Sequence, residues 1–150
     1  MGAESIQTKL IERTVTFDDF PTESPAFRKL LHRLRRAAES ECPVFLAGEP
    51  GVGKTLLALA VHNASRRSSK PFGNLSLGEV RAELAASELF GHVKGAFTGA
   101  DEDRQGLFRS ADGGTLFIDE VGAAPVEVQT ALLSAIEFHQ VRPLGSDVHV

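Results

Sequence analysis

The sequence has a single cysteine, Cys42, and no apolar run near the roughly 18 residues that a membrane-spanning helix needs. One cysteine excludes an internal disulfide and fits a reducing cytosol, so we expect a cytoplasmic protein without a membrane span. The N-terminus has no signal-peptide core. Its Met1-Gly2 start does not satisfy the myristoylation motif, because the sixth residue is Ile6 rather than serine or threonine.

Charge and histidine spacing argue against two further kinds of site. The net charge of −4 gives no bulk reason for nucleic-acid binding, and we expect no DNA-binding element in this chain. The histidines lie too far apart for metal-ligand spacing: His32, His62, His92, His139 and His149. With 150 residues, 42% hydrophobic and 24% charged, the chain has the composition of one soluble globular domain or a piece of a larger one.

A glycine-rich stretch matches the phosphate-binding loop pattern G-x-x-x-x-G-K-[ST], the Walker A motif, at every constrained position. Such a loop needs glycines where its backbone N–H groups approach phosphate oxygens closely. The lysine reaches the β- and γ-phosphates, and the following hydroxyl holds Mg²⁺. The residues are Gly48, Glu49, Pro50, Gly51, Val52, Gly53, Lys54 and Thr55. The pattern predicts nucleotide binding.

The flanking sequence favours this interpretation over a glycine turn with a chance lysine. The apolar run Pro43–Ala47 predicts a buried strand before the loop, and Leu56–Val61 predicts a helix after it. A strand, a glycine loop and a helix together direct helix N-terminal N–H groups at an anion.

An acidic pair follows a second apolar run. Thr115–Ile118 predicts a buried parallel strand, and Asp119 and Glu120 come directly after it. The first acid can orient Mg²⁺ and its waters, and the second can polarise the attacking water. Such a pair alone is usually a strand ending at the surface, but after a phosphate loop it indicates a second nucleotide motif.

A second glycine-rich loop covers Gly91–Ala100 and is too rich in glycine for a regular element. Loops of this length inside a compact domain are usually functional. Phe97 lies between its glycines, and two interpretations stay open: the ring folds back into a groove, or it is exposed for a partner. An unrelated P-loop kinase or GTPase would leave this loop unexplained.

The remaining sequence predicts elements around these motifs. Ser24 and Pro25 have the residue types of an N-cap and a first helical position. The expected elements are helices near 24–38, 78–89 and 125–137, a strand at 71–77 and a hairpin within 139–150 that turns at Gly145-Ser146. We expect residues 1–23 to form a lead-in segment, anchored at Val15, Phe17 and Phe20, that packs across the nucleotide site.

With these residues in place, the sequence resembles the AAA+ domain of sigma-54-dependent transcriptional activators, the bacterial enhancer-binding proteins. Three segments carry the resemblance in the family's order. They are the phosphate loop at 48–55, the stretch 88–100 with an intact GAFTGA sequence, and the Walker B segment 111–120. The resemblance extends from about Ser24 to Val150.

The resemblance implies a three-layer α/β P-loop NTPase core with a mainly parallel sheet. It implies a ring-forming ATPase, commonly a hexamer, that uses ATP and Mg²⁺ to remodel sigma-54 RNA polymerase. By position, Lys54, Asp119 and Glu120 would be catalytic, and Thr55 and Asp119 would hold the metal. The sigma-54 contact would come from Gly95, Ala96, Phe97, Thr98, Gly99 and Ala100, with Phe97 and Thr98 as the contacting pair.

The sequence departs from the family at several positions. Ser76 stands where the family commonly has an asparagine that holds the catalytic glutamate, and a shorter side chain puts contact with Glu120 in question. Thr55 stands where the family commonly has glutamate, and Pro21-Thr22 replaces the usual Ile-Gly or Val-Gly. The sensor asparagine, the arginine fingers and the helical lid would lie beyond Val150. We therefore expect 24–150 to be a partial domain, with ATP hydrolysis undecided and a non-catalytic interaction module as the alternative.

Overall fold

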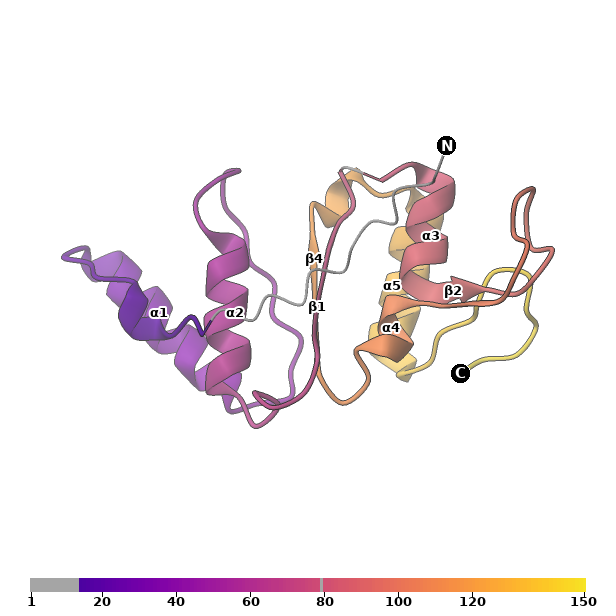
Figure 1. The fold of residues 1–150 in the computed structure, drawn as a ribbon. Coiled ribbons are helices and arrows are strands. Elements are labelled where there is room, and N and C mark those ends of the chain that lie inside the picture. The colour runs from indigo at the N-terminus through magenta and orange to yellow at the C-terminus, as the bar shows by residue number, and fades with distance from the viewer. Residues whose placement is uncertain (1–13, 79) are drawn as a thin grey trace.

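The structure is a computed structural model, and it describes residues 14–78 and 80–150. The described chain is a mixture of helices and short strands (Figure 1). The elements are η1 (Phe17–Asp19), α1 (Pro25–Ala38), α2 (Lys54–Ala64), β1 (Phe72–Ser76), α3 (Ala82–Phe90), β2 (Gly91–His92), β3 (Arg104–Gln105), α4 (Leu107–Ser110), β4 (Thr115–Asp119), η2 (Val121–Ala123) and α5 (Val126–Phe138).

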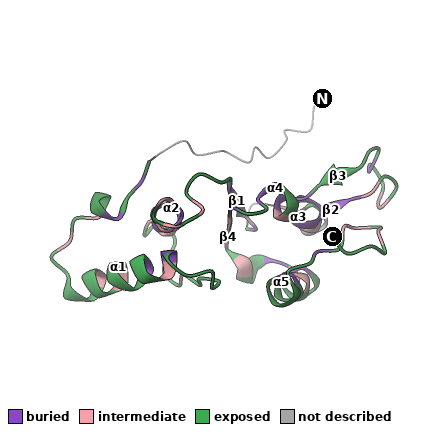
Figure 2. Cartoon of the chain, turned by 90° about the horizontal axis from the view of Figure 1, so that it is seen from below, coloured by how far each residue is buried: buried purple, intermediate pink, exposed green. Residues whose placement is uncertain are grey.

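The architecture has three layers around the parallel pair β1 and β4. Helices α1 and α2 cover one face of this pair, and α3, α4 and α5 lie on the other (Figures 1 and 2). The register pairs Phe72 with Thr115 and Ser76 with Asp119, so both strands end at the same level. This arrangement confirms the expected three-layer α/β core. A second, antiparallel pair, β2 with β3, forms the base of the glycine-rich loop.

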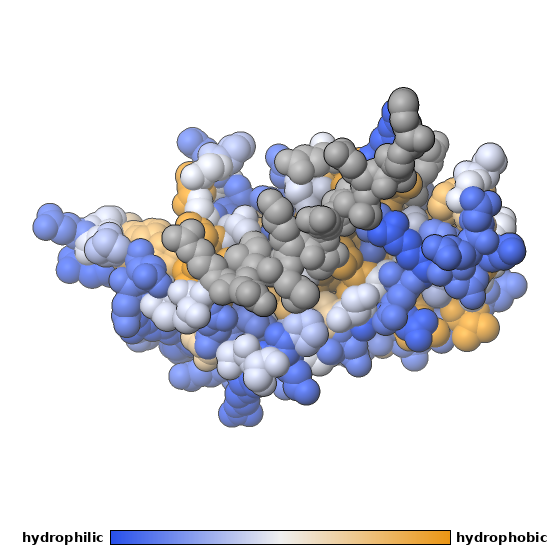
Figure 3. Space-filling model, in the orientation of Figure 1, coloured by the Kyte–Doolittle hydropathy of each residue, from blue (hydrophilic) through white to orange (hydrophobic). Residues whose placement is uncertain are grey.

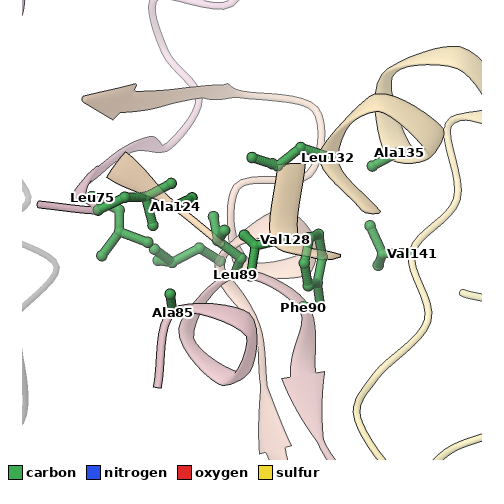
Figure 4. Packing of buried hydrophobic residues seen from close by; sticks show 11 residues of the cluster. Leu75, Ala85, Leu89, Phe90, Ala124, Val128, Leu132, Ala135 and Val141 are labelled. Carbon is green, nitrogen blue, oxygen red and sulfur yellow. The ribbon is translucent and has the colours of Figure 1, made fainter. Parts of the chain in front are cut away.

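Each face of the β1–β4 pair has its own hydrophobic cluster, because successive side chains of a strand point to opposite faces. Phe72 and Phe117 pack with residues of α1 and α2. Leu75, Leu116 and Ile118 pack with the other cluster. Figure 4 shows this second cluster, in which Leu89 of α3 and Val128 of α5 point toward one another. The sheet pair therefore supports both helical layers.

The start of α1 follows the sequence prediction. Ser24 Oγ accepts a hydrogen bond from the Phe27 backbone N–H, and Pro25 takes the first helical turn. On the apolar side of α1, Leu31, Leu34 and Ala38 are buried. The prediction of a capped helix is thus confirmed.

One predicted strand is wrong. The run Pro43–Ala47 pairs with no strand in the described parts of the chain, and Phe45 keeps 80% of its surface exposed. Only Leu46 packs against the α1–α2 cluster. An apolar run has the composition of a buried strand, but strand formation also needs a neighbour with a free edge next to it, which this segment does not have.

Smaller differences concern element ends. The predicted helix at 78–89 begins at Ala82, and Leu84 on it is 40% exposed. On α5, Val128 and Leu132 are buried, whereas Leu133 and Ile136 are exposed. The predicted C-terminal hairpin is reduced to a mutual pair of backbone hydrogen bonds between Val141 and Val150, with Gly145 at the turn.

The described part of the lead-in segment packs against the helical layer of α1 and α2. Val15 and Phe17 are buried against α1 and α2, and Asn63 Nδ2 donates to the Val15 carbonyl. Residues 1–13 of the predicted lead-in lie outside the described residues. The visible surface is mostly hydrophilic with apolar patches (Figure 3), and no described helix is long and apolar enough to cross a membrane.

His62 joins the helical layer to the sheet. Its Nδ1 lies 2.9 Å from the Thr115 hydroxyl at the start of β4, and the residue is 4% exposed. Burial lowers the pKa of His62 from its ordinary value of 6.5, against a smaller raising effect of a backbone hydrogen bond with Lys70. The folded protein therefore favours the neutral imidazole.

This pKa shift predicts an acid-sensitive core. Below about pH 6.5 the unfolded chain binds a proton at His62 that the folded chain resists, so the free energy of unfolding should fall as pH decreases. His62→Gln cannot titrate and should flatten this dependence in denaturant titrations between about pH 7.5 and 5.5. His32→Gln, on the exposed side of α1, is the control and should leave it unchanged. Equal slopes for wild type and His62→Gln would contradict the assignment.

Candidate functional site

The phosphate-loop motif and the acidic pair lie at the same end of the molecule. In Figure 1 the chain between Ala47 and α2 turns at the upper end, where β1 and β4 also terminate. A cavity of about 1270 Å³ is lined there by Gly48, Pro50, Gly51, Lys54, Asp119 and Glu120. The motif's other members, Glu49, Val52, Gly53 and Thr55, are not part of its lining. The fold thus brings together residues about 65 positions apart in the sequence.

The loop's conformation explains two of its glycines. Gly51 has φ +79° and Gly53 has φ +90°, a left-handed backbone that side chains disfavour. No atom lies within 4 Å of a Cβ placed at either position, so the conformation rather than crowding requires glycine. The Lys54 ammonium donates to the carbonyls of Gly48 at 3.1 Å and Glu49 at 2.9 Å. The ammonium is therefore held over its own loop, at the cavity wall.

Helix α2 begins at Lys54 directly after the loop. Its N-cap, Gly53, provides no side-chain hydrogen bond, and the first intrahelical bond is from the Leu57 N–H to the Gly53 carbonyl. Because glycine has no side chain, the N-cap residue leaves the N–H groups of the first turn without a side-chain partner. Together with the helix dipole they favour an anion at this position.

The acidic pair occupies the end of β4 and the residue after it. Asp119 Oδ1 accepts a hydrogen bond from the Glu120 N–H at 2.9 Å. Glu120 has φ +53°, an uncommon value for a residue with a side chain. Backbone outliers of this kind concentrate at functional sites, where the surrounding structure maintains them.

Ser76 does reach Glu120. The Ser76 hydroxyl, at the end of β1, donates to Glu120 Oε2 at 3.3 Å. Contact is possible because Gly78 leaves room, since a Cβ there would overlap the same carboxylate oxygen. Serine is shorter than the asparagine that the resemblance leads one to expect, but Gly78 lets the Glu120 carboxylate lie within reach of Ser76. Sequence reasoning missed Gly78, which no motif marks.

The GAFTGA loop is a separate structure, and none of Gly95–Ala100 lines the cavity. The loop is closed by a bond from the Gly95 N–H to the Ala100 carbonyl at 2.8 Å. Gly95 and Gly99 have φ +82° and +97°, again without crowding at a Cβ position. At the loop's base, the Val93 N–H donates to the Leu144 carbonyl, which ties it to the C-terminal segment.

Phe97 folds back rather than projecting freely. Its ring meets His92 edge-on, with centroids 4.9 Å apart, and the residue is half-buried. His92 Nδ1 in turn lies 2.7 Å from the hydroxyl of Ser87, which is 1% exposed. Of the two interpretations of Phe97, the structure shows the folded-back one. Thr98 is exposed at the loop's tip.

An ion pair between a buried carboxylate and a partly exposed arginine joins α3 to β3, at the base of the same loop. Arg104 of β3 makes two contacts with the Glu88 carboxylate, Nη1 to Oε1 at 2.7 Å and Nη2 to Oε2 at 2.9 Å. The Glu88 side chain is only 8% exposed, and that of Arg104 is 42% exposed. Sequence reasoning missed this pair and Ser87, because partners 16 residues apart are not signalled by any local spacing.

The described residues contain no group of three or more histidine, cysteine, aspartate or glutamate side chains that could hold a metal ion. A divalent cation here would have to draw most of its oxygen ligands from phosphates and water. That is the usual manner of Mg²⁺, which binds proteins through one or two side chains.

The ion pair gives a stability prediction. Arg104→Met keeps the side-chain length but leaves Glu88 charged, buried and unpaired, so it should lower the free energy of unfolding by about 2–3 kcal/mol. Chemical denaturation measures this. The control is Asp18→Asn, which breaks the exposed Arg35–Asp18 pair (55% and 89% exposed) and should cost less than about 1 kcal/mol. Equal losses from both variants would show that the Glu88 environment is not special.

Comparison with known proteins is consistent with this geometry. The family described as Sigma-54 interaction domain matches residues 20–150. The transcriptional regulatory protein GlrR of Escherichia coli is 48% identical over 126 residues, covering 84% of this chain and 28% of GlrR. The response regulator protein PilR of Pseudomonas aeruginosa is 46% identical over 128 residues, 85% of this chain and 29% of PilR. The chain thus spans less than a third of these relatives.

Among solved structures, NtrX from Brucella abortus in complex with ATP is similar. The TM-score is 0.77 at 28% identity, over 87% of this chain and 28% of that one. Its complex with ADP gives the same values. Since the family match covers most of the described structure and several relatives approach half identity, the chain belongs to the sigma-54 interaction domain family of bacterial transcriptional regulators.

Proposed function

We propose that this chain is the ATP-binding core of a sigma-54-dependent transcriptional regulator. The observation that carries the proposal is the convergence of Lys54, Asp119 and Glu120 on one cavity, with the GAFTGA loop outside it. In such a protein, ATP binding and hydrolysis at the cavity drive remodelling of sigma-54 RNA polymerase through the loop. The ATP complex of the similar NtrX structure supports the choice of nucleotide.

The phosphates of ATP are held by three groups of this chain. The N–H groups around Gly51 and Gly53 and those of the first turn of α2 would hold the phosphate oxygens. Lys54 releases its bonds to the loop carbonyls and neutralises the β- and γ-phosphates. Glu49, Pro50 and Val52 complete the loop that shapes this binding site.

Mg²⁺ would be held through Thr55 and Asp119. A hydroxyl and a carboxylate are oxygen donors of the kind that Mg²⁺ prefers, and the ion would neutralise charge developing on the phosphates. Glu120 orients the attacking water. In the structure the Glu120 carboxylate accepts a hydrogen bond from Ser76 and lies beside Gly78. If Glu120 gave up this bond to hold a water molecule, the change would be felt at the end of β1 and in the chain that leads to α3.

The partner surface is the Gly95–Ala100 loop, with Phe97 and Thr98 in contact with sigma-54. Thr98 is exposed, and Phe97 becomes available when its ring leaves His92. An aromatic ring with few rotatable bonds suits a central anchor of an interface. In the longer proteins of this family, self-association into a ring would bring copies of the site together.

Binding to Lys54 is the most direct test of this function. Lys54→Ala should weaken ATP binding by about tenfold or more, because hydrogen bonds to a charged group contribute about 1.5–3 kcal/mol. Isothermal titration calorimetry with ATP and Mg²⁺ measures the affinity. Lys29→Ala, on the exposed surface of α1, is the matched control and should bind like wild type. Equal, weak binding by all three proteins would overturn the proposal.

A second candidate is a non-catalytic interaction module that binds ATP without turnover. The observation that favours it is the segment before the phosphate loop, since Pro43–Ala47 lies outside the sheet and gives the loop little support.

A steady-state ATPase assay at rising protein concentration separates the two candidates. Catalysis that needs neighbouring copies should rise more than linearly with concentration, as expected for sites completed by an arginine finger, which contributes about 10³–10⁵ in turnover of GTPases. Glu120→Gln should remove this activity. A flat, background rate at every concentration favours the binding module.

A further inference from the structure

Helix α1 carries positive charge without any charge of the opposite sign. Its 14 residues include five of the chain's 16 lysines and arginines and none of its 20 aspartates and glutamates. The rest of the chain is therefore acidic, and the net charge of −4 averages over a positive helix and a negative remainder. The expectation of no DNA-binding element rests on that average and does not describe α1 itself.

Four of the five cations form one exposed side of α1, which we call the basic face. An α-helix turns once in about 3.6 residues, so these four side chains project opposite the side that carries Leu31 and Leu34. Both leucines are buried against α2. The basic face consists of the exposed residues Arg28, Lys29, Arg33 and Arg36. Figure 2 shows α1 at the edge of the molecule, with most of its surface exposed.

The basic face has no carboxylate partner within the described residues 14–78 and 80–150. Arg28 Nη2 donates a hydrogen bond to the Glu23 carbonyl at 3.2 Å, which leaves its charge uncompensated. The fifth cation of α1 differs. Arg35 Nη2 lies 2.8 Å from Asp18 Oδ1, and its guanidinium lies 5.4 Å from the centre of the Phe17 ring. Arg35 therefore holds the lead-in segment, whereas the basic face is open to an anion from outside.

Repulsion within the basic face argues against a surface that only contacts water. Lys29 and Arg33 are four residues apart, and Arg33 and Arg36 are three apart, so cations are neighbours on the helix surface. Like charges at these spacings destabilise a helix, whereas interspersed glutamates would stabilise it. The first turn also lacks the acidic residue that the helix dipole favours there. This arrangement favours an anionic partner that offsets the repulsion.

The side chains of α1 indicate which kind of anion fits. A helix that binds a membrane surface inserts its apolar side, but on α1 that side is packed against α2. A protein interface usually has an apolar or aromatic centre, and none of the described large hydrophobic residues that are exposed lies on α1. Three of the four cations of the basic face are arginines, whose planar guanidinium groups suit phosphate. A row of such groups without apolar contacts matches a nucleic-acid backbone.

We propose that the basic face of α1 binds the phosphate backbone of double-stranded DNA. From Arg28 to Arg36 the helix rises about 12 Å, and the same length of duplex carries about seven negative charges, enough for four cations. Contacts to phosphate position a protein on DNA without reading its bases, so the binding is independent of sequence. This surface does not depend on the proposed nucleotide site.

The acidic remainder of the chain does not cancel this attraction. Charges in water are screened beyond about 8 Å at physiological ionic strength, whereas α1 is about 21 Å long. The carboxylates that flank the helix in sequence, Glu23 and Glu39, lie at its two ends. In Figure 1 α1 lies at the left end of the molecule and the Gly91–Ala100 loop at the right. DNA on the basic face would therefore leave that loop free.

Salt dependence of DNA binding tests the proposal. Fluorescence anisotropy with the whole chain, without ATP, gives its affinity for two labelled duplexes of about 30 base pairs and unrelated sequence, between about 25 and 200 mM salt. Four phosphate contacts predict a slope of about −3.6 for the logarithm of the association constant against that of the salt concentration. Both duplexes should bind equally.

Charge-removing variants locate the contact. The double variant Arg33→Gln/Arg36→Gln should halve the slope to about −1.8 and weaken binding at the lowest salt at least about tenfold. Its matched control, Lys94→Gln/Arg142→Gln, removes two exposed charges outside α1 and should bind like wild type. Circular dichroism checks that both proteins fold.

Reversing one charge separates binding from stability. Arg33→Glu places a carboxylate between Lys29 and Arg36 at helical spacing, so it should leave the thermal midpoint unchanged or raise it. The same change should weaken DNA binding more than Arg33→Gln does, because it adds repulsion to the loss of a contact. A loss of DNA binding in a protein at least as stable as wild type cannot come from unfolding.

The outcomes separate this inference from its rivals. Salt-independent binding or none by wild type, equal affinity of wild type and the Arg33/Arg36 variant, or an equal loss in the Lys94/Arg142 variant overturns the inference. Polyglutamate of matched charge that displaces labelled DNA as well as unlabelled DNA does also overturns it, in favour of an acidic protein partner. Loss of DNA binding with intact ATP binding leaves the proposed function standing, and the reverse result contradicts only the proposed function.

Discussion

The parallel pairing of β1 with β4 is the interaction on which the rest of the structure depends. It places Ser76 opposite Asp119, so that two strands from distant parts of the sequence end side by side. Its two faces carry the two hydrophobic clusters, and so it joins α1 and α2 to α3, α4 and α5. Without this pair the acidic residues would have no fixed position relative to the phosphate loop.

The same strand ends connect the nucleotide site to the second loop through short, specific contacts. Glu120 is held in a left-handed backbone conformation with its carboxylate beside Ser76 and Gly78. The chain continues from Gly78 into α3. The last turn of α3 holds the loop's base through the Glu88–Arg104 ion pair and through the contact of Ser87 with His92. Helix α3 therefore lies between the contacts of Glu120 and those of Phe97, and coupling through it would require two stable arrangements of these contacts.

Much of this could be predicted from sequence, because the relevant signals are local. The capping pair Ser24-Pro25, the strand before Asp119 and the span of α5 each depend on neighbouring residues. The predictions that were wrong or missing depend on residues far away in the sequence. Pro43–Ala47 has the composition of a strand but no adjacent strand to pair with, and nothing around Ser76 indicated that Gly78 makes room for Glu120. The Ser87–His92–Phe97 stack is likewise a matter of tertiary placement. The sequence therefore indicated the motif residues but not the residues that hold them in position.

The central claim is that the phosphate loop and the acidic pair act on one bound nucleotide. Amide hydrogen exchange of the chain with and without ATP and Mg²⁺ tests it most directly, because exchange reports each segment separately. A nucleotide shared by both motifs should slow exchange in two places, Gly51–Leu56 and Asp119–Val121, which are distant in sequence and adjacent only in the fold. Protection confined to the loop, with the Asp119–Val121 amides unchanged, would contradict a shared site.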